Sequence, residues 1–177
     1  MQIRPGSLLI AHPVHSNTEH RKHLVYITES NSINTVGVIL NKLSNYDMCE
    51  FMQQKGRSWY GDRAIHIGGI YNPHSLIMLH DINWYSSHTM QVNSRYNVSS
   101  DVIMLEKMEM GNTPDWYKLF IGCTAWSAGE LAHDLRRRNP RWLLIPNPTD
   151  ELVQSDIKYQ WDHAVAEYSQ DVFDSYF

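Results

Sequence analysis

The sequence contains little cysteine, no long apolar run and no excess of positive charge. Its only two cysteines, Cys49 and Cys123, lie far apart in the 177 residues. A disulfide framework or a cysteine-rich zinc site would need more cysteines at closer spacing. We therefore expect two free thiols in a reducing cytosol.

Signals for membrane insertion or secretion are also missing. The apolar run near the N-terminus ends at His12 and Pro13, before it reaches the length of a signal-peptide core. No other stretch approaches the roughly 20 apolar residues that a membrane-spanning helix needs. These features predict a cytoplasmic protein that does not associate with a membrane.

The balance of charge argues against a nucleic-acid-binding protein. Asp and Glu number 19 against 15 Lys and Arg, which gives a net charge of −4. Because DNA-binding domains usually carry a basic face, we expect no sequence-specific DNA binding. The expected partners are proteins, and the sequence specifies neither their identity nor the oligomeric state.

What is present is typical of a globular domain. Hydrophobic residues make up 42% of the chain and charged residues 19%. The length suits a single domain over residues 1–177. Irregularly mixed strand and helix patterns, without a regular βαβ alternation, favour the α+β class.

The apolar patterns and turn residues place the expected elements. The strands expected are 7–11, 24–28, 36–41, 64–67, 76–79, 116–123 and 142–145, with residues 24–28 and 36–41 forming a hairpin. The helices expected are 47–55, 100–110, 127–139 and one from about 155, while 85–97 is expected as strand plus loop. We expect the acidic and aromatic tail 169–177 to pack onto the body of the protein through Val172, Phe173, Tyr176 and Phe177.

Two interpretations compete for Ser127. The sequence around it, AWSAG, is similar to the G-x-S-x-G turn that carries the nucleophile of α/β-hydrolases, and Asp150 or Asp156 with His163 would follow in the required order. However, Ser127 and Glu130 also form the S-x-x-E pattern of a capping box, in which the Ser hydroxyl accepts a hydrogen bond from the helix and the Glu carboxylate accepts one from the Ser amide. We favour the cap, because the preceding strands form hairpins and not parallel strand–helix units.

Four histidines, His12, His15, His20 and His23, lie within twelve residues. Neutral imidazoles can bind zinc, but this spacing matches no standard zinc pattern. We favour a polar surface loop and expect no bound metal.

Residues 136–141, RRRNPR, form the basic cluster of the chain. Arginines there could contact phosphate or an acidic partner. We favour the alternative that they interact with the negative end of a helix dipole.

Several blocks, in order, resemble the pattern of one bacterial family, YqgE/AlgH. They are 6–13 (GSLLIAHP), 36–43 (VGVILNKL), 67–70 (IGGI), 76–80 (LIMLH) and 121–131 (IGCTAWSAGEL). The resemblance implies an α+β domain whose mixed, mostly antiparallel, bifurcated sheet curls into a pseudo-barrel flanked by helices. It also implies a link to transcriptional regulation of exopolysaccharide synthesis, without an agreed reaction. The family has Gly where this chain has Ser127.

Six residues that match the family pattern fall at the ends of expected strands. These candidate ligand-binding residues are Asn41, Gly68, Gly69, His80, Gly122 and Trp126. We expect loops at strand ends to bring them together, with glycines allowing close approach of a ligand or of another backbone.

These observations predict a non-enzymatic regulatory or interaction protein, with no catalytic residues and no cofactor. The alternative is a small-molecule-binding domain or a small hydrolase that uses the turn expected at Gly122–Gly129.

Overall fold

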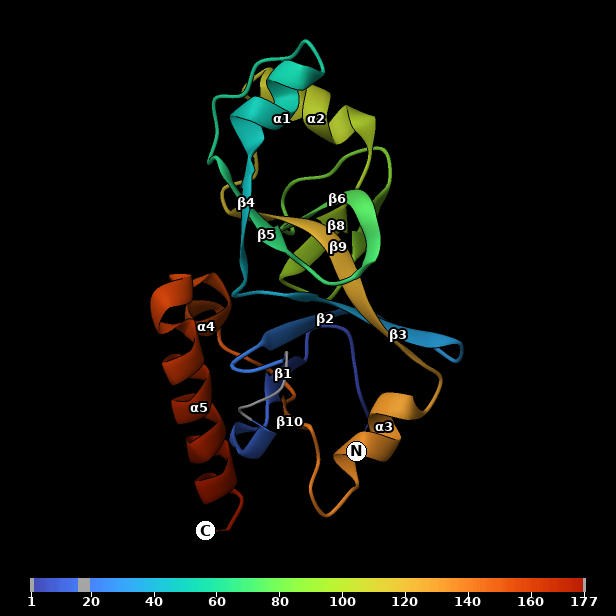
Figure 1. Ribbon diagram of the computed structural model, residues 1–177, viewed down its shortest axis with the longest axis vertical. Helices are drawn as coiled ribbons and strands as arrows, with labels where there is room; N and C mark the ends of the chain where they lie inside the picture. Colours follow the sequence, from blue (N-terminus) through green and yellow to red (C-terminus); the bar gives the residue numbers. More distant parts are fainter. Residues whose placement is uncertain (1, 16–19, 177) are drawn as a thin grey trace. The chain divides into compact units, whose positions relative to one another are not determined.

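The structure is a computed structural model that describes residues 2–15 and 20–176. Strands and helices are mixed along the chain, which confirms the predicted α+β class (Figure 1). Among the described residues, the strands pair antiparallel with the exception of one parallel pair. The contacts within the chain divide it into two compact units, described separately below. Unit 1 consists of residues 1–42 and 124–177, and unit 2 of residues 43–123.

Unit 1 is built around an antiparallel sheet. Its strands, in spatial order, are β10 (Trp142–Ile145), β1 (Leu8–Ala11), β2 (Leu24–Ser30), β3 (Asn34–Ile39) and the last residues, 124–127, of β9 (Tyr117–Ser127). The predicted hairpin is confirmed as β2 and β3. Its turn is closed by the Asn31 side chain, which accepts hydrogen bonds from the amides of Ile33 and Asn34.

The core of unit 1 collects apolar side chains from the sheet and from helix α3 (Glu130–Leu135). Leu9, Val25, Leu131 and Trp142 are all buried in it. Short helical turns η1 (Pro13–His15) and α4 (Asp150–Gln154) and the long helix α5 (Ile157–Asp174) complete the unit. The sequence did not predict α4, which the hydroxyl of Thr149 caps by accepting a hydrogen bond from the Leu152 amide.

The prediction that the C-terminal tail packs onto the body is wrong for its described residues. Helix α5 continues to Asp174, and Val172, Phe173 and Tyr176 are 38%, 59% and 80% exposed. A continuous helix fixes the direction of these side chains, so the tail cannot fold back to bury them.

Unit 2 has a second sheet and two capped helices. Its strands are β4 (Leu43–Asp47), β5 (Ala64–Ile67), β6 (Tyr71–Asp81), β7 (Thr89–Gln91), β8 (Tyr96–Ser99) and residues 117–123 of β9. Residues of β9 pair antiparallel with β6 on one side and parallel with β5 on the other. Asp47 and Asp101 cap helices α1 (Met48–Gln54) and α2 (Val102–Glu109) through their carboxylates. Both helices bury methionines in a core with Trp59, Trp84 and Leu119.

Candidate ligand-binding site

Asn41 has a structural role within unit 1. Its Oδ1 accepts a hydrogen bond from the Leu24 amide at 2.9 Å, and its Nδ2 donates to the Lys22 carbonyl at 2.7 Å. Lys22 has a φ of 57°, an uncommon conformation for a residue other than glycine. The Asn41 side chain therefore holds the strained entry into β2.

The three predicted glycines of unit 2 lie together at one end of the ladder between β6 and β9. Gly68 donates from its amide to the Ile121 carbonyl at 2.9 Å. A Cβ atom placed on Gly122 would lie 2.5 Å from the carbonyl oxygen of Gly69, and Gly122 has a φ of 71°. Glycine is required at position 122 because one backbone approaches another there.

His80 lies toward the other end of the same ladder, opposite Tyr117. Its side chain is fully buried, and its Nδ1 donates to the Asp81 carbonyl at 2.8 Å. Its Nε2 lies 2.8 Å from the Ser99 hydroxyl, and its ring packs edge-on against Trp84. Burial lowers the pKa of His80, so it stays neutral with both nitrogens engaged.

Trp126 belongs to unit 1, where its ring packs at 89° against Trp142 with 5.9 Å between centroids. The structure thus brings the three glycines together in unit 2 and places His80 apart from them in that unit. Asn41 and Trp126 lie in the other unit, so a site shared by all six residues stays a prediction.

The prediction that Ser127 is the N-cap residue is wrong, although the predicted contact of Glu130 with the Ser127 amide is present at 3.0 Å. Strand β9 extends to Ser127, and α3 begins only at Glu130, with Gly129 in its left-handed conformation as the N-cap residue. The Ser127 hydroxyl donates a hydrogen bond to Glu130 at 2.9 Å and accepts none from the helix. The reason is tertiary, because β3 offers an edge on which residues 124–127 pair as strand.

The same geometry removes the hydrolase turn expected at Gly122–Gly129. A nucleophile elbow needs a strained turn at the serine. Among the described residues, only Lys22 and Asn72 combine a side chain with a positive φ, and Ser127 lies in regular strand. Burial raises the pKa of the Cys123 thiol, which disfavours the thiolate form that a nucleophile needs.

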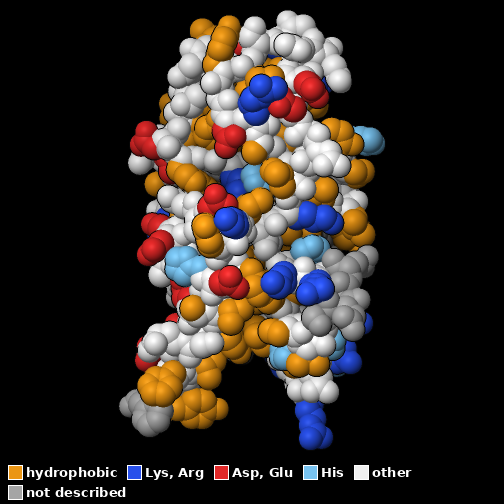
Figure 2. Space-filling view, turned by 60° about the vertical axis from the view of Figure 1, so that its left-hand side comes forward, with side chains coloured by type: hydrophobic (Ala, Val, Ile, Leu, Met, Phe, Trp, Pro, Cys, Tyr) orange, Lys and Arg blue, Asp and Glu red, His pale blue; other side chains and the backbone are white. Residues whose placement is uncertain are grey.

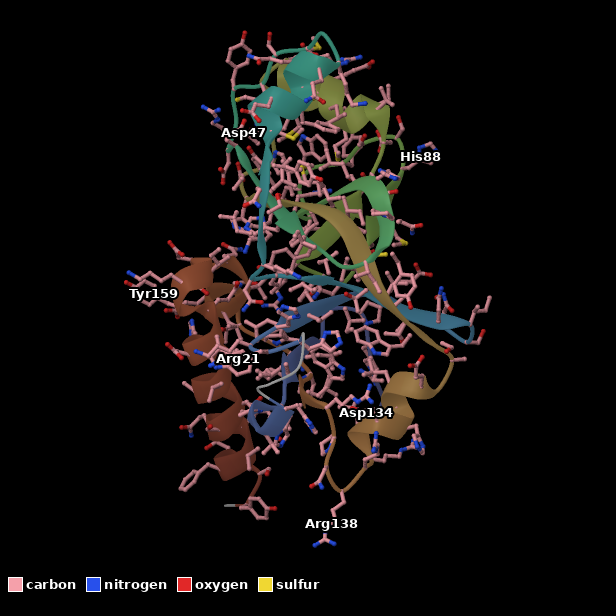
Figure 3. The ribbon with its side chains drawn as sticks, in the orientation of Figure 1. Arg21, Asp47, His88, Asp134, Arg138 and Tyr159 are labelled. Atoms are coloured by element: carbon pink, nitrogen blue, oxygen red, sulfur yellow. The ribbon has the colours of Figure 1, made fainter. Side chains whose placement is uncertain are left out.

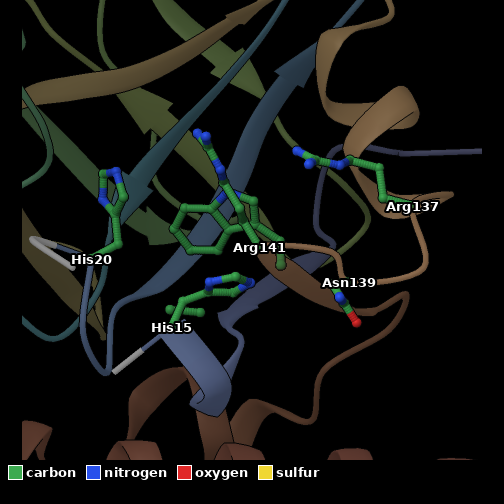
Figure 4. Close-up of a pocket in the computed structure, with 7 residues that line it drawn as sticks. His15, His20, Arg137, Asn139 and Arg141 are labelled. Atoms are coloured by element: carbon green, nitrogen blue, oxygen red, sulfur yellow. The ribbon is translucent and has the colours of Figure 1, made fainter. Parts of the chain in front are cut away.

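The structure instead brings together the histidine and arginine clusters, which lie far apart in the sequence. They line a pocket of about 400 Å³ in unit 1 (Figure 4). The lining residues are Ala11, His15, His20, Arg137, Asn139, Arg141 and Trp142. We call this cavity the basic pocket.

Strand pairing explains why these distant segments meet. Strands β1 and β10 are antiparallel with Ala11 opposite Trp142, and the His12 amide donates to the Arg141 carbonyl at 2.8 Å. The Ala11 amide in turn donates to the carbonyl of His23, just before β2. The end of β1 and the starts of β2 and β10 therefore lie at the same end of the sheet.

The electrostatics of the basic pocket favour an anion. Its described lining includes two arginines and two histidines and no carboxylate. Arg137 lies 3.8 Å from Asp134, the limit of an ion pair, whereas the Arg141 guanidinium has no ion pair among the described residues. On the face shown in Figure 2, Lys, Arg and His side chains gather at the lower right.

A second hollow of about 160 Å³ adjoins the same arginines. Trp126, Glu130, His133 and Asp134 line it together with residues of the basic pocket, Arg137, Arg141 and Trp142. Arg138 lines neither cavity, and Figure 3 shows it extending away from the chain in the loop between α3 and β10.

In the ranges 2–15 and 20–176, no three His, Cys, Asp or Glu side chains are arranged to hold a metal ion. Within the same ranges, no helix has both the length and the apolar surface that crossing a bilayer requires.

Comparison with known proteins agrees with this fold. A model of the family described as DUF179, AlgH-like, matches residues 8–172. The chain belongs to this AlgH-like family. The match confirms the resemblance that the sequence blocks indicated.

AlgH-like relatives cover nearly the whole chain. The UPF0301 protein of Marinomonas sp. (strain MWYL1) is 28% identical over 161 residues, covering 88% of this chain and 84% of that protein. A UPF0301 protein of Xanthomonas campestris pv. campestris (strain B100) is 25% identical over 172 residues, covering 95% of this chain and 90% of that protein. The solution structure of the AlgH protein from Pseudomonas aeruginosa shares the fold with a TM-score of 0.73 at 21% identity, covering 94% of this chain and 90% of that one.

Proposed function

We propose that this AlgH-like protein is a regulatory protein of the cytosol that acts by binding an anionic ligand in the basic pocket, without catalysing a reaction. The observation that carries the proposal is the meeting of the histidine and arginine clusters around one cavity. A protein partner would then respond to the presence of the ligand.

The identity of the basic groups supports an anion as the ligand. Arg137 and Arg141 carry planar guanidinium groups, which bind carboxylate and phosphate oxygens through paired hydrogen bonds. Arg141 makes no ion pair within the described residues, so binding an anion would not first require breaking one. The volume, about 400 Å³, lies toward the small end of the roughly 300–1,000 Å³ usual for small-molecule sites.

The positions of the reactive side chains support binding without catalysis. Ser127 is hydrogen-bonded to Glu130 in place of a histidine, and His80 is buried with both nitrogens engaged. The basic pocket itself offers positive charge and an amide, and no carboxylate among its described lining residues. The free thiols of Cys49 and Cys123 support a location in the reducing cytosol.

Calorimetric titration with inorganic phosphate tests the proposal. Replacing Arg141 by Gln should weaken phosphate binding by roughly 10- to 100-fold, because a hydrogen bond to a charged group contributes about 1.5–3 kcal/mol. Arg138→Gln is the matched control, since it removes the same charge from a side chain outside the pocket. Phosphate binding that is absent in the wild type, or that both substitutions weaken equally, would contradict the proposal.

A further inference from the structure

The lining of the basic pocket combines cationic groups with flat rings. The cations are the guanidinium groups of Arg137 and Arg141, and the rings are those of His15, His20 and Trp142. A purely ionic site for phosphate would need only the guanidinium groups. The rings therefore point to a second part of the ligand.

Two of these rings, those of His20 and Trp142, pack against each other beside the cavity, and we call this pair the ring wall. The His20 ring lies 5.5 Å from the Trp142 ring, centroid to centroid, at an angle of 49°. Trp142 is 4% exposed, so its indole is anchored in the core of unit 1, and the His20 ring packed on it is the more exposed of the two. A wall held in this way can pack against a flat aromatic ring without rearranging.

The remaining polar group of the lining suits the recognition of a heterocycle or a sugar. Asn139 carries an amide that can donate and accept hydrogen bonds. In the part of the chain that the structure describes, this amide lines the pocket without an internal hydrogen bond. It stands in the same loop as Arg137 and Arg141, so one segment offers groups for both parts of a ligand (Figure 4).

We infer that the ligand of the basic pocket is a mononucleotide, with its phosphate on the arginines and its base against the ring wall. This inference rests on the proposed function and specifies its ligand. Arginine planes and aromatic rings both stack on nucleobases, and this stacking tolerates different bases. The cavity volume of about 400 Å³ suits one compact nucleotide.

Calorimetry with a set of related compounds tests the inference. The probes are AMP, UMP, adenosine, ribose 5-phosphate, inorganic phosphate and a 5′-phosphorylated trinucleotide. We expect AMP and UMP to bind about 10-fold or more tightly than ribose 5-phosphate, because stacking of a base adds affinity. Adenosine should bind weakly, because it lacks the charged group that the arginines recognise.

Two substitutions separate the two parts of the site. His20→Ala should lower the affinity for AMP about 10-fold and leave that for ribose 5-phosphate within about 2-fold, because it removes one ring of the wall. Arg141→Gln should weaken both. His88→Ala is the control, since it removes an exposed histidine from unit 2 and should change neither affinity. Circular dichroism checks that each variant is folded.

Each result has a defined meaning. If phosphate binds through Arg141 but AMP binds no more tightly than ribose 5-phosphate, the nucleotide inference is overturned and the proposed function stands. If none of the anions binds, both are overturned. A trinucleotide that binds more tightly than AMP would overturn the mononucleotide inference in favour of a nucleic-acid end.

Discussion

Ser127 donates two hydrogen bonds to one oxygen, Oε2 of Glu130, from its backbone amide at 3.0 Å and from its hydroxyl at 2.9 Å. The carboxylate thus reaches back from the first turn of α3 to the last residue of β9. It fixes the direction in which the chain leaves the strand. The Ser127 hydroxyl is a donor here, the opposite of its role in a capping box, whereas the bond from the Ser127 amide to Glu130 is one that a capping box also has.

This relationship predicts the order of two substitutions. Ser127→Gly should destabilise the protein by roughly 0.5–1 kcal/mol more than Ser127→Ala, because glycine is unfavourable within a strand. Both lose the hydroxyl and keep the amide. Urea denaturation measures the difference, and the opposite order would restore the helix-cap interpretation.

The hydrolase interpretation has its own measurement. Because Ser127 is hydrogen-bonded to a carboxylate and lies in regular strand, a fluorophosphonate probe should not label it. Ser127→Ala serves as the unlabelled reference in the same mass-spectrometric assay. Specific labelling of the wild type at Ser127 would show that it is a nucleophile after all.

Replacing Gly122 by Ala should be strongly destabilising. Its added Cβ would lie 2.5 Å from the Gly69 carbonyl oxygen, in addition to the cost of a φ of 71°. Gly111→Ala is a matched control in the same unit, with a φ of 82° and no atom within 4 Å of the added carbon. We expect Gly122→Ala to cost about 1–3 kcal/mol more than Gly111→Ala, the usual cost of overpacking. If thermal or urea denaturation shows that both variants lose the same free energy of unfolding, the backbones at Gly122 and Gly69 are not in tight contact.

Stability should fall when the pH drops from about 6.5 to about 4. Burial lowers the pKa of His66 from 6.5 to about 4, so in this window the unfolded chain binds a proton that the folded chain does not. The free energy of unfolding should therefore decrease as the pH falls, by at most about 1.4 kcal/mol per pH unit for this residue. Well above pH 6.5 the residue is neutral in both states and contributes no slope.

His66→Asn provides the comparison for this pH dependence. His66 Nδ1 lies 3.1 Å from the Leu119 carbonyl, and an asparagine amide can donate the same hydrogen bond without titrating. Its urea-unfolding free energy should vary less with pH between 6.5 and 4 than that of the wild type. His80, whose pKa burial also lowers, should keep part of the slope. Identical slopes in the two proteins would refute the assignment to His66.

The isolated protein should not recognise a specific DNA sequence. The net charge is −4, and two of the clustered arginines, Arg137 and Arg141, line the small basic pocket. Specific binders reach Kd values of about 10⁻⁸–10⁻¹¹ M at physiological salt. Selection from a random duplex pool, followed by fluorescence anisotropy, should enrich no motif in that range. An enriched motif bound this tightly would contradict the prediction.

Local sequence was sufficient for several elements of the fold. The predicted strands 64–67 and 142–145 coincide with β5 and β10, because short apolar runs between turn residues leave little choice of boundary. Helices were expected to begin at Asp47 and at Ser100 or Asp101, and Asp47 and Asp101 cap α1 and α2. A capping carboxylate accepts hydrogen bonds from amides only two or three residues later, so the start of such a helix can be predicted without knowledge of distant contacts.

The sequence alone determined the α+β class, the family, the hairpin of β2 and β3 and the capped helices of unit 2, since each depends on neighbouring residues or on an ordered set of motifs. Only the tertiary structure decided that residues 124–127 are strand, because they pair with the edge of β3, which lies about 90 residues earlier in the sequence. It also decided that the histidine and arginine clusters share one pocket, because the antiparallel register of β1 and β10 sets Ala11 opposite Trp142. Periodicity within each segment carries no information about that register, which long-range pairing and burial select together.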